Sequence, residues 1–172
     1  MSSSFAAGYA LLSEDKQSSD DGEDFAFTSL DGNTKHLSDY RGKIIVLDMW
    51  ATWCQPCHYQ MLELKKIYQH YNSTDLEILS IDTYDGETSS DVKNFLNKFE
   101  KQATQLNWTF GMEKNSLEKY KGEGIPSLCI FDQQGEVYYK HTGLCFFKEP
   151  VPSWGSNIKN PVFLKEKIDQ LL

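Results

Sequence analysis

The chain has 172 residues, of which 40% are hydrophobic and 24% are charged, a composition typical of a globular protein with one domain, or one domain and a tail. Its formal net charge of −8 argues against nucleic acid as a partner, because no basic stripe exists to neutralise phosphates. A folded chain of this size buries about 70% of its extended surface, so its core needs no disulfide staples, and no segment reaches the ~20 apolar residues of a membrane span.

The N-terminal segment combines an apolar stretch with an acidic one. Residues 5–12 read FAAGYALL, and residues 13–24 hold six acidic side chains and one lysine. One interpretation is a disordered leader, and the other is the remnant of an anchor or signal segment followed by a flexible tether. Both remain open. We expect residues 1–23 to be a leader or tether and residues 24–172 to form one domain.

The domain is expected to begin with strands. Residues 24–40 predict two short strands around an Asp31-Gly32 turn, that is, an N-terminal β-hairpin. Residues 42–50 form a continuous apolar run rich in β-branched side chains, which indicates a central strand covered on both faces. A helix follows at the cysteine pair, because large side chains recur at steps of four and three: Cys57, Met61, Leu64, Tyr68 and Tyr71.

A second strand and helix come next. Residues 75–82 predict another buried strand, and residues 89–106 predict a helix with a serine available as N-cap. The apolar side chains expected on the inner face of this helix are Val92, Phe95, Leu96, Phe99 and Ala103.

The C-terminal part is expected to contain a hairpin, a loop and a helix. Residues 127–141 predict a hairpin around a Gln133-Gln134-Gly135 turn. Residues 146–160 form a loop broken by proline and glycine, which would be a partner surface or a cap over a sheet edge, and we favour the cap. Pro161 is expected to open a final helix that ends at Leu172.

The order of these elements indicates the fold class. Two strands precede a β-α-β-α unit, which is followed by a β-hairpin and a helix. A βαβ unit that feeds an antiparallel hairpin gives a mixed central β-sheet flanked by helices on both faces. The expected fold is therefore α/β with an N-terminal β-hairpin extension.

The four cysteines are unevenly spaced. Cys54 and Cys57 form a close pair, whereas Cys129 and Cys145 stand apart. A zinc site needs four ligands, commonly in two close pairs, and the second pair is missing, so we expect no metal. A structural disulfide that closes so short a loop would constrain little chain entropy. Cys129 and Cys145 would pair in an oxidising compartment or act as small buried side chains in a reducing one, and we favour the second.

A redox role accounts best for the Cys-x-x-Cys motif. At a strand-to-helix junction, Cys54 lies at the helix N-terminus, where unpaired backbone N–H groups and the helix dipole favour a thiolate. Such surroundings lower a cysteine pKa from ~8.5 to roughly 3.5–7.5. Pro56 is compatible with the first helical turn, since the amide it lacks has no intrahelical partner there. We expect Cys54 to attack a substrate disulfide and Cys57 to resolve the mixed disulfide.

The stretch VLDMWATWCQPC at residues 46–57 resembles the active-site strand and motif of thioredoxin. Residues 37–57 resemble more specifically the thioredoxin-like reductases of the TlpA/ResA type, and the resemblance covers residues 24–172. It implies a thioredoxin fold and a thiol–disulfide oxidoreductase without a cofactor. The expected partners are protein disulfide substrates and an upstream thiol reductant, and we expect a monomer. Such proteins are typically membrane-tethered or periplasmic, hence extracytoplasmic, and often serve cytochrome c maturation.

The resemblance also implies which residues bind substrate. The Gly-Ile-Pro-Ser stretch at residues 124–127 matches the second signature of the family, in which the proline is cis and faces the cysteine pair. The backbone beside this proline pairs with the bound substrate peptide. The substrate-binding residues that we expect are Trp53, Gln55, Pro56, Ile125, Pro126 and Gly143.

Asp48 is expected to take part in proton transfer. It lies inside an apolar strand, so burial should raise its pKa. Thioredoxin has a buried acid at this position, and the resemblance therefore gives Asp48 the transfer of protons to and from Cys57. Relatives often carry glutamate where this chain has Gln60, and thioredoxin has a lysine where this chain carries Ile78. Proton transfer would then depend more heavily on Asp48.

Aromatic and histidine side chains next to the motif have two interpretations. His58 would favour a thiolate as a cation, or it would face solvent. Trp50 and Trp53 would pack the core and shield the disulfide, and Trp53 would also be placed to touch substrate.

Several functions compete with the leading hypothesis of a reductant of protein disulfides. The alternatives are a cytosolic thioredoxin-like electron carrier and a thioredoxin-fold binding or chaperone module, and the intact Cys54 and Cys57 argue against the module. A thiol peroxidase is disfavoured, because its peroxidatic cysteine lacks a partner two residues later. Gln55 and Pro56 supply no histidine to stabilise the thiolate, so we expect a reduction potential closer to about −270 mV than to about −120 mV.

Overall fold

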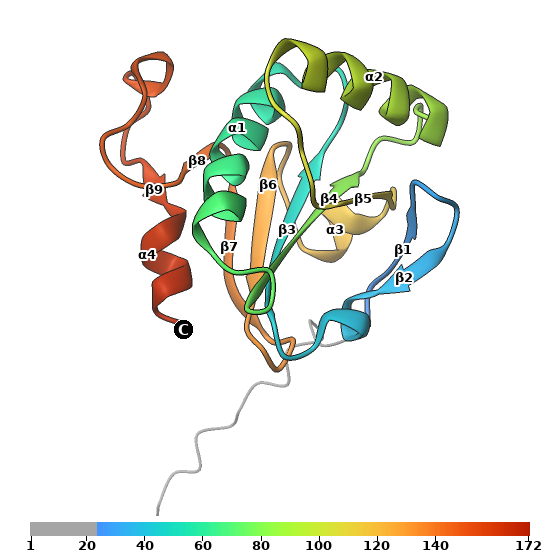
Figure 1. The fold of residues 1–172 in the computed structure, drawn as a ribbon, viewed down its shortest axis with the longest axis horizontal. Helices are drawn as coiled ribbons and strands as arrows, with labels where there is room; N and C mark the ends of the chain where they lie inside the picture. The colour runs from blue at the N-terminus through green and yellow to red at the C-terminus, as the bar shows by residue number, and fades with distance from the viewer. Residues whose placement is uncertain (1–23) are drawn as a thin grey trace, which may run out of the picture.

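The computed structural model describes residues 24–172, and the expectation of a leader or tether at residues 1–23 lies outside this part. The helices packed around a central sheet are visible in Figure 1. The strands are β1 (Ala26–Ser29), β2 (Thr34–His36), β3 (Ile44–Trp50), β4 (Leu76–Asp82), β5 (Thr109–Met112), β6 (Ser127–Phe131), β7 (Val137–Thr142), β8 (Cys145–Phe146) and β9 (Val162–Phe163). The α-helices are α1 (Gln55–His70), α2 (Ser89–Gln102), α3 (Ser116–Lys119) and α4 (Leu164–Asp169).

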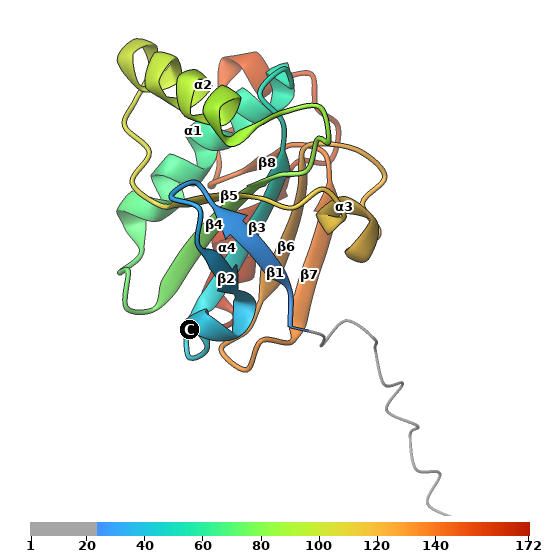
Figure 2. The ribbon, with the colours of Figure 1, turned by 90° about the vertical axis from the view of Figure 1, so that its right-hand side faces the viewer.

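A seven-stranded mixed sheet forms the centre of the described chain. Its strand order is β2-β1-β5-β4-β3-β6-β7. β3 pairs in parallel with β4 and antiparallel with β6, as a βαβ unit followed by a hairpin requires. The hairpin β1–β2 lies at one edge of the sheet, in the foreground of Figure 2. The predicted mixed α/β sheet with an N-terminal hairpin is therefore confirmed.

The central position of β3 follows from its sequence. All of its residues are buried, as expected for an apolar run with a neighbouring strand on each side. Alternate side chains enter two different cores: Ile44 and Val46 face α1, whereas Ile45 and Leu47 face the opposite side. Because of this alternation, Asp48 shares the side of the sheet that α1 covers.

The two cores are built from different elements. The first combines the sheet with α1, α2 and α4, and its buried residues from α1 are Cys57, Met61, Leu64 and Ile67. The second lies on the other face of the sheet, where residues from β1, the segment after β2 and the end of α3 cover it: Phe25, Phe27, Leu37 and Tyr120. The active-site helix α1 thus rests on a fully formed apolar layer.

Helix α2 differs in detail from its prediction. Thr88, and not a serine, is the N-cap, and Thr88 and Asp91 exchange hydrogen bonds as a capping box. The helix ends at Gln102, so the expected continuation to residue 106 is wrong. Ala103 is exposed and does not belong to the inner face, because the chain has left the helical conformation there.

The C-terminal prediction is also partly wrong. Pro161 does not open a helix, because Val162 and Phe163 form β9, which pairs with β8, and α4 begins only at Leu164 and ends at Asp169. The loop at residues 146–160 lies between these two strands.

This loop packs on α1 through aromatic rings. Trp154 stacks on Tyr59 of α1 with ring centroids 4.6 Å apart, and it also contacts Phe146 at 5.6 Å. The segment expected to cap a sheet edge therefore covers a flank of the active-site helix.

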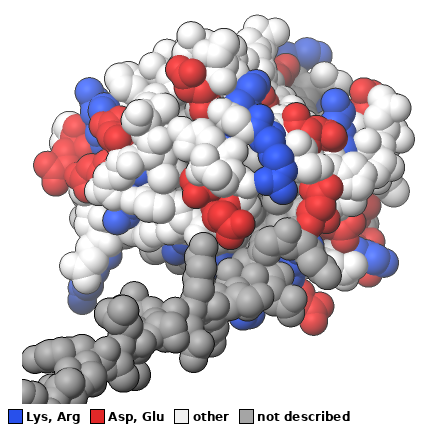
Figure 3. All heavy atoms as spheres, turned by 90° about the horizontal axis from the view of Figure 1, so that it is seen from below, with Lys and Arg blue, Asp and Glu red and all other residues white. Residues whose placement is uncertain are grey.

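The surface shows mixed charge. On the face drawn in Figure 3, acidic and basic side chains are interspersed, and no continuous basic stripe crosses it. None of the helices between residues 24 and 172 has the length and apolar character needed to cross a bilayer.

Candidate active site

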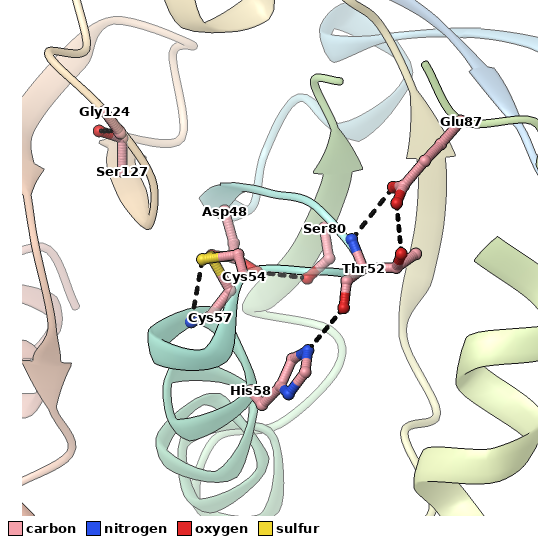
Figure 4. The surroundings of a disulfide bond; sticks show 9 residues. All are labelled: Asp48, Thr52, Cys54, Cys57, His58, Ser80, Glu87, Gly124 and Ser127. Carbon is pink, nitrogen blue, oxygen red and sulfur yellow. Dashed lines mark hydrogen bonds between the residues drawn. A yellow bond between two sulfur atoms is a disulfide. The ribbon is translucent and has the colours of Figure 1, made fainter. Parts of the chain in front are cut away.

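Cys54 and Cys57 form a disulfide between the end of β3 and the start of α1. The S–S distance is 2.03 Å and the Cα–Cα distance is 5.3 Å. β3 ends at Trp50, a short loop follows, and Cys54 is the N-cap of α1. The predicted strand-to-helix junction at the cysteine pair is confirmed, and Figure 4 shows the disulfide at the first turn of the helix.

The first turn of α1 presents backbone N–H groups to Cys54. The N–H of Cys57 lies 3.3 Å from the Sγ atom of Cys54 and 3.0 Å from its carbonyl oxygen, and it donates to both. Pro56 costs no hydrogen bond in this turn, since the amide it lacks would have had no intrahelical partner. A thiolate at Cys54 would be stabilised by the Cys57 N–H and by the positive end of the helix.

The two sulfur atoms differ in their access to solvent. Cys54 keeps 3% of its surface exposed, whereas Cys57 is 0% exposed. Another molecule can therefore reach Cys54 first, and Cys57 can act only on a sulfur atom already inside the site. This difference supports Cys54 as the attacking and Cys57 as the resolving residue.

Asp48 is a fully buried acid under α1. Its Oδ2 atom accepts a 2.9 Å hydrogen bond from the Ser80 hydroxyl, which in turn accepts one from the indole N–H of Trp108 at 3.0 Å. Its Oδ1 atom has no hydrogen-bond partner among residues 24–172. Burial raises the pKa of Asp48 to about 7, and the bond from Ser80 opposes this shift. The carboxyl can therefore gain or lose a proton near neutral pH.

The neighbour of Asp48 on β4 is Ser80, and sequence comparison with thioredoxin had pointed to Ile78. The register pairs Asp48 with Ser80, whereas Ile78 pairs with Val46 one step before it on the same side of the sheet. Ser80, and not Ile78, is therefore the residue of β4 that donates a hydrogen bond to Asp48.

The Gly-Ile-Pro-Ser loop enters the site from β6. The Ile125–Pro126 peptide is cis, and β6 runs antiparallel to β3 with Ser127 opposite Met49. The start of β6 therefore lies at the end of the sheet from which the cysteine loop emerges, and Figure 4 includes Gly124 and Ser127 in the surroundings of the disulfide. Pro126 is buried and Ile125 is half-buried.

Gly143 ties this loop to the end of β7. Its N–H donates to the carbonyl oxygen of Pro126 at 2.8 Å. Its φ of 112° is a conformation that other residues rarely adopt, which accounts for a glycine here. An added Cβ would meet His141 at an ordinary 3.5 Å, so steric contact within the chain does not require glycine.

A cavity of about 340 Å³ opens beside the Pro126 loop. Ser127 and Leu128 of β6 lie on one side of it and Lys140, His141 and Thr142 of β7 on another. Burial lowers the pKa of His141. The cavity is also lined by Met49, Tyr120, Lys121, Gly122 and Glu123.

The substrate-binding residues expected within the Cys-x-x-Cys segment are exposed. Trp53 is 61% exposed and packs edge to face against Tyr84, which is 47% exposed, with ring centroids 5.6 Å apart. Gln55 and Pro56 are exposed as well. The expectation that Trp53 packs the core is wrong, whereas Trp50 is fully buried, as expected.

Gln60 has a structural role in the described chain. Its side chain accepts a 2.8 Å hydrogen bond from the N–H of Cys145 and donates one of 3.3 Å to the Cys145 carbonyl. Glu63, one helical turn later, accepts a 2.9 Å hydrogen bond from the N–H of Phe147 and forms an ion pair with Lys66. Together they fasten β8 to α1, a role that sequence reasoning did not assign to either residue.

His58 neither faces solvent freely nor points at the cysteines. Its Nε2 atom donates to the carbonyl oxygen of Thr52 at 2.8 Å, and its ring lies against Phe95 with centroids 4.8 Å apart. The Thr52 N–H donates to Glu87 at 3.0 Å, and its hydroxyl donates to the same carboxylate. Sequence reasoning missed Glu87, because its position in a loop 35 residues away carries no periodic signal.

The other two cysteines lie on opposite faces of the sheet. Cys129 belongs to the core opposite α1, and Cys145 belongs to the core that contains Cys57. Both are buried, and the structure does not join them to each other. Burial, together with the charge of Asp48, raises the pKa of Cys145 to about 12. Within residues 24–172, no group of three or more histidine, cysteine or acidic side chains is arranged to hold a metal ion.

The sheet order and the disulfide at the N-terminus of α1 define a thioredoxin-like protein with a redox-active Cys-x-x-Cys motif. The model of the AhpC/TSA family matches residues 19–140, and the chain belongs to this family. The chain is 32% identical over 120 residues to the thiol-disulfide oxidoreductase ResA of Geobacillus kaustophilus (strain HTA426), an alignment that covers 70% of this chain and 66% of the relative. The chain thus matches about two thirds of the length of this relative.

Solved structures support the same fold. The putative thiol:disulfide interchange protein DsbE from Chlorobium tepidum superposes with a TM-score of 0.65 at 22% identity, over 87% of this chain and 94% of that chain. The pneumococcal exposed lipoprotein thioredoxin (Etrx1) from Streptococcus pneumoniae gives 0.57 at 28% identity, over 70% and 90%. The chain carries the site of a ResA-like thiol–disulfide oxidoreductase, and the resemblance seen in its sequence is confirmed.

Proposed function

We propose that the protein reduces disulfide bonds in other proteins by dithiol–disulfide exchange. The observation that carries this proposal is the placement of the two cysteines. Cys54 is the N-cap of α1 and keeps 3% of its surface exposed, whereas Cys57 is fully buried and disulfide-bonded to it. A nucleophile that is more accessible than its resolving partner is the arrangement that dithiol–disulfide exchange needs.

The proposed reaction has two steps. In the first, the Cys54 thiolate attacks one sulfur of the substrate disulfide, that bond breaks, and the leaving substrate sulfur takes up a proton as a thiol. In the second, Cys57 loses its proton and attacks the Cys54 sulfur, which forms the intramolecular disulfide and releases the second substrate thiol. Two electrons pass from the protein to the substrate; of the two protons that the substrate thiols gain, one comes from Cys57 and one from solvent, and an upstream dithiol returns the two electrons.

Asp48 is the proposed proton acceptor in the second step. It shares the α1 side of the sheet with Cys57. Its Oδ1 atom accepts no hydrogen bond from residues 24–172 and can therefore take up a proton. A pKa near 7 allows it to take a proton from a thiol and to release it afterwards.

The substrate peptide is proposed to lie across the exposed motif and the Pro126 loop. Trp53 offers an apolar surface next to Cys54, and the backbone at Ile125 is placed at the same end of the sheet. The residues proposed to contact substrate are Trp53, Gln55, Pro56, Ile125, Pro126 and Gly143. No cofactor takes part in this chemistry.

An extracytoplasmic location, tethered to a membrane or periplasmic, is proposed for the protein. The support comes from the TlpA/ResA resemblance and from Etrx1, which is named an exposed lipoprotein. Partners in cytochrome c maturation follow from the same resemblance. Fusion of the complete gene product to alkaline phosphatase, which is active only outside the cytoplasm, tests the location. An inactive fusion, made at normal levels, would favour the cytosolic carrier.

The function is tested by reduction of insulin with dithiothreitol as the electron source. The wild-type protein should accelerate precipitation of the insulin B chain, and Cys54→Ser should abolish this acceleration. Cys129→Ala is the matched control, because it removes a buried thiol on the other face of the sheet. Equal activity of the wild type and Cys54→Ser would contradict the proposal.

A further inference from the structure

The loop between Trp50 and Cys54 is held by a carboxylate that lies outside the motif. Glu87 accepts hydrogen bonds from both the N–H and the hydroxyl of Thr52, the first at 3.0 Å, as Figure 4 shows. His58 binds the remaining polar group of Thr52, its carbonyl oxygen, at 2.8 Å. All three polar groups of Thr52 therefore have partners, and two of the three bonds end on Glu87.

Glu87 lies near a second carboxyl group, that of Asp82, and both line the same cavity. Asp82 ends β4 directly beside Trp50 in the parallel register and is 1% exposed. Its Oδ1 atom accepts a 2.8 Å hydrogen bond from the N–H of Tyr84. Its Oδ2 atom is buried and receives no hydrogen bond from the donors of residues 24–172. Two carboxylates can bond to each other only if one of them carries a proton.

The surroundings of this pair are acidic. A cavity of about 210 Å³ adjoins it, lined by Asp82, Tyr84, Asp85, Glu87, Met112, Glu113 and Lys114. Lys114 forms a 3.2 Å ion pair with the exposed Asp85, so this cation is engaged with another acid. From α1, the titratable His58 binds the same threonine.

The electrostatics agree with this geometry. Burial and the neighbouring Glu87 carboxyl both raise the pKa of Asp82, to about 8, and the N–H of Tyr84 only partly opposes them. Asp82 thus holds its proton at neutral pH, and Glu87 remains the charged acceptor for Thr52.

We propose that Glu87 is a positioning residue for the Cys-x-x-Cys loop, and that a proton shared between Asp82 and Glu87 keeps it in place. Loss of this proton leaves two adjacent negative charges, which repel each other and loosen the hold on Thr52. The segment that carries Trp53 and leads to Cys54 then loses its fixed geometry. The effect on exchange rests on the proposed function, whereas the shared proton does not.

The shared proton is tested by NMR on the oxidised protein, in which neither Cys54 nor Cys57 titrates. The amide of Thr52 should show a step in its ¹H and ¹⁵N shifts centred near pH 8. Asp82→Asn should remove this step, since an amide donates to Glu87 at every pH. Asp85→Asn and Asp48→Asn are matched controls that should keep it. A Thr52 amide without a step between about pH 6 and 10, or a step that persists in Asp82→Asn, would overturn the proposal.

The positioning role is tested by the rate of insulin reduction at pH 7. Glu87→Ala should lower kcat/KM about tenfold or more, because small displacements of a reacting group cost this much. Glu87→Gln should recover part of this loss, since its amide oxygen can accept from the Thr52 N–H and its amide nitrogen can donate to the Thr52 hydroxyl. Equal losses in both variants at unchanged melting temperature would overturn the positioning role. Absence of activity in the wild type would instead contradict the proposed function. The shared proton would then be tested by the NMR titration alone.

Discussion

Ser80 donates a hydrogen bond to only one of the two carboxyl oxygens of Asp48. Its hydroxyl donates a 2.9 Å hydrogen bond to Oδ2, while Oδ1 of the same carboxyl is buried and has no partner among residues 24–172. A carboxylate in such a place is costly, and protonation relieves the cost. The neighbourhood of this acid therefore leads to predictions on both stability and chemistry.

The first prediction concerns stability of the oxidised protein. The pKa of Asp48 in the folded protein, about 7, lies above the ordinary aspartate value of 3.8, so the folded protein binds more protons between these two pH values and its stability falls as the pH rises through this range. Asp48→Asn removes this loss and should be more stable than wild type at pH 8 by on the order of 2 kcal/mol. Urea unfolding at several pH values measures the difference, and a difference that does not grow between about pH 4 and 8 would contradict the assignment.

The second prediction concerns the exchange reaction. Asp48→Asn should slow the release of the mixed disulfide by roughly 10²-fold at pH 7, since general base catalysis contributes about this much. The first attack by Cys54 does not need this base and should change little. Stopped-flow measurements that follow substrate capture and thiol release separately can distinguish the two steps, and equal slowing of both would refute the role of Asp48 as base for Cys57.

The third prediction concerns the direction of electron flow. The residues between the cysteines are Gln55 and Pro56, and neither supplies a cation to stabilise the Cys54 thiolate. The reduction potential should therefore be nearer to the value of about −270 mV of thioredoxin than to about −120 mV of DsbA. Equilibration with glutathione buffers measures it, and a value above about −180 mV would reverse the proposed direction.

The fourth prediction concerns Gln60. Gln60→Ala leaves the N–H and the carbonyl of Cys145 buried without their partners, which should cost about 2–4 kcal/mol of unfolding free energy. Gln55→Ala, on the exposed side of the same helix, serves as the control and should change stability by less than about 0.5 kcal/mol. Denaturant unfolding at pH 7 compares them, and equal stability of the two variants would rule out the fastening role.

The fifth prediction concerns Trp53. Because this side chain is 61% exposed, Trp53→Ala should leave the melting temperature nearly unchanged. If it contacts substrate, KM for a protein disulfide should rise roughly tenfold, while the rate with a small aromatic disulfide stays the same. Trp154→Ala is the matched control, since Trp154 is also exposed but stacks on Tyr59. Similar KM values for both variants would remove Trp53 from the binding surface.

The predictable part of the fold is the part with local signals. The apolar run of β3 and the change to helical spacing after Cys54 place the motif correctly, because each depends on a few neighbouring residues. The predicted start of the C-terminal helix at Pro161 is wrong, because Val162 and Phe163 pair with β8. Pairing between distant segments leaves no signal in the local sequence. Pro161 precedes a strand for this reason, although proline is also frequent at the first position of a helix.

The part of the site that lies in one continuous stretch of sequence was also predictable. Cys54, Cys57 and Asp48 follow from a contiguous motif, whereas Ser80 and Glu87 reach the site from β4 and from the loop after it. The identity of a partner across a sheet depends on register, and a shift by two residues separates Ile78 from Ser80. A side chain in a connecting loop, such as Glu87, becomes visible only when the tertiary structure is known.

The distribution of the remaining cysteines has a practical consequence for measuring the redox state. Cys129 and Cys145 are buried in separate cores, so they should not react with a thiol reagent added to the native protein. A native titration with an aromatic disulfide reagent then reports the Cys54–Cys57 couple without background, because Cys57 completes the exchange that Cys54 begins, whereas the denatured protein should yield two additional equivalents in either state. The sheet thus separates Cys129 from the redox couple, burial alone shields Cys145, and each protein molecule can be counted as a carrier of one electron pair.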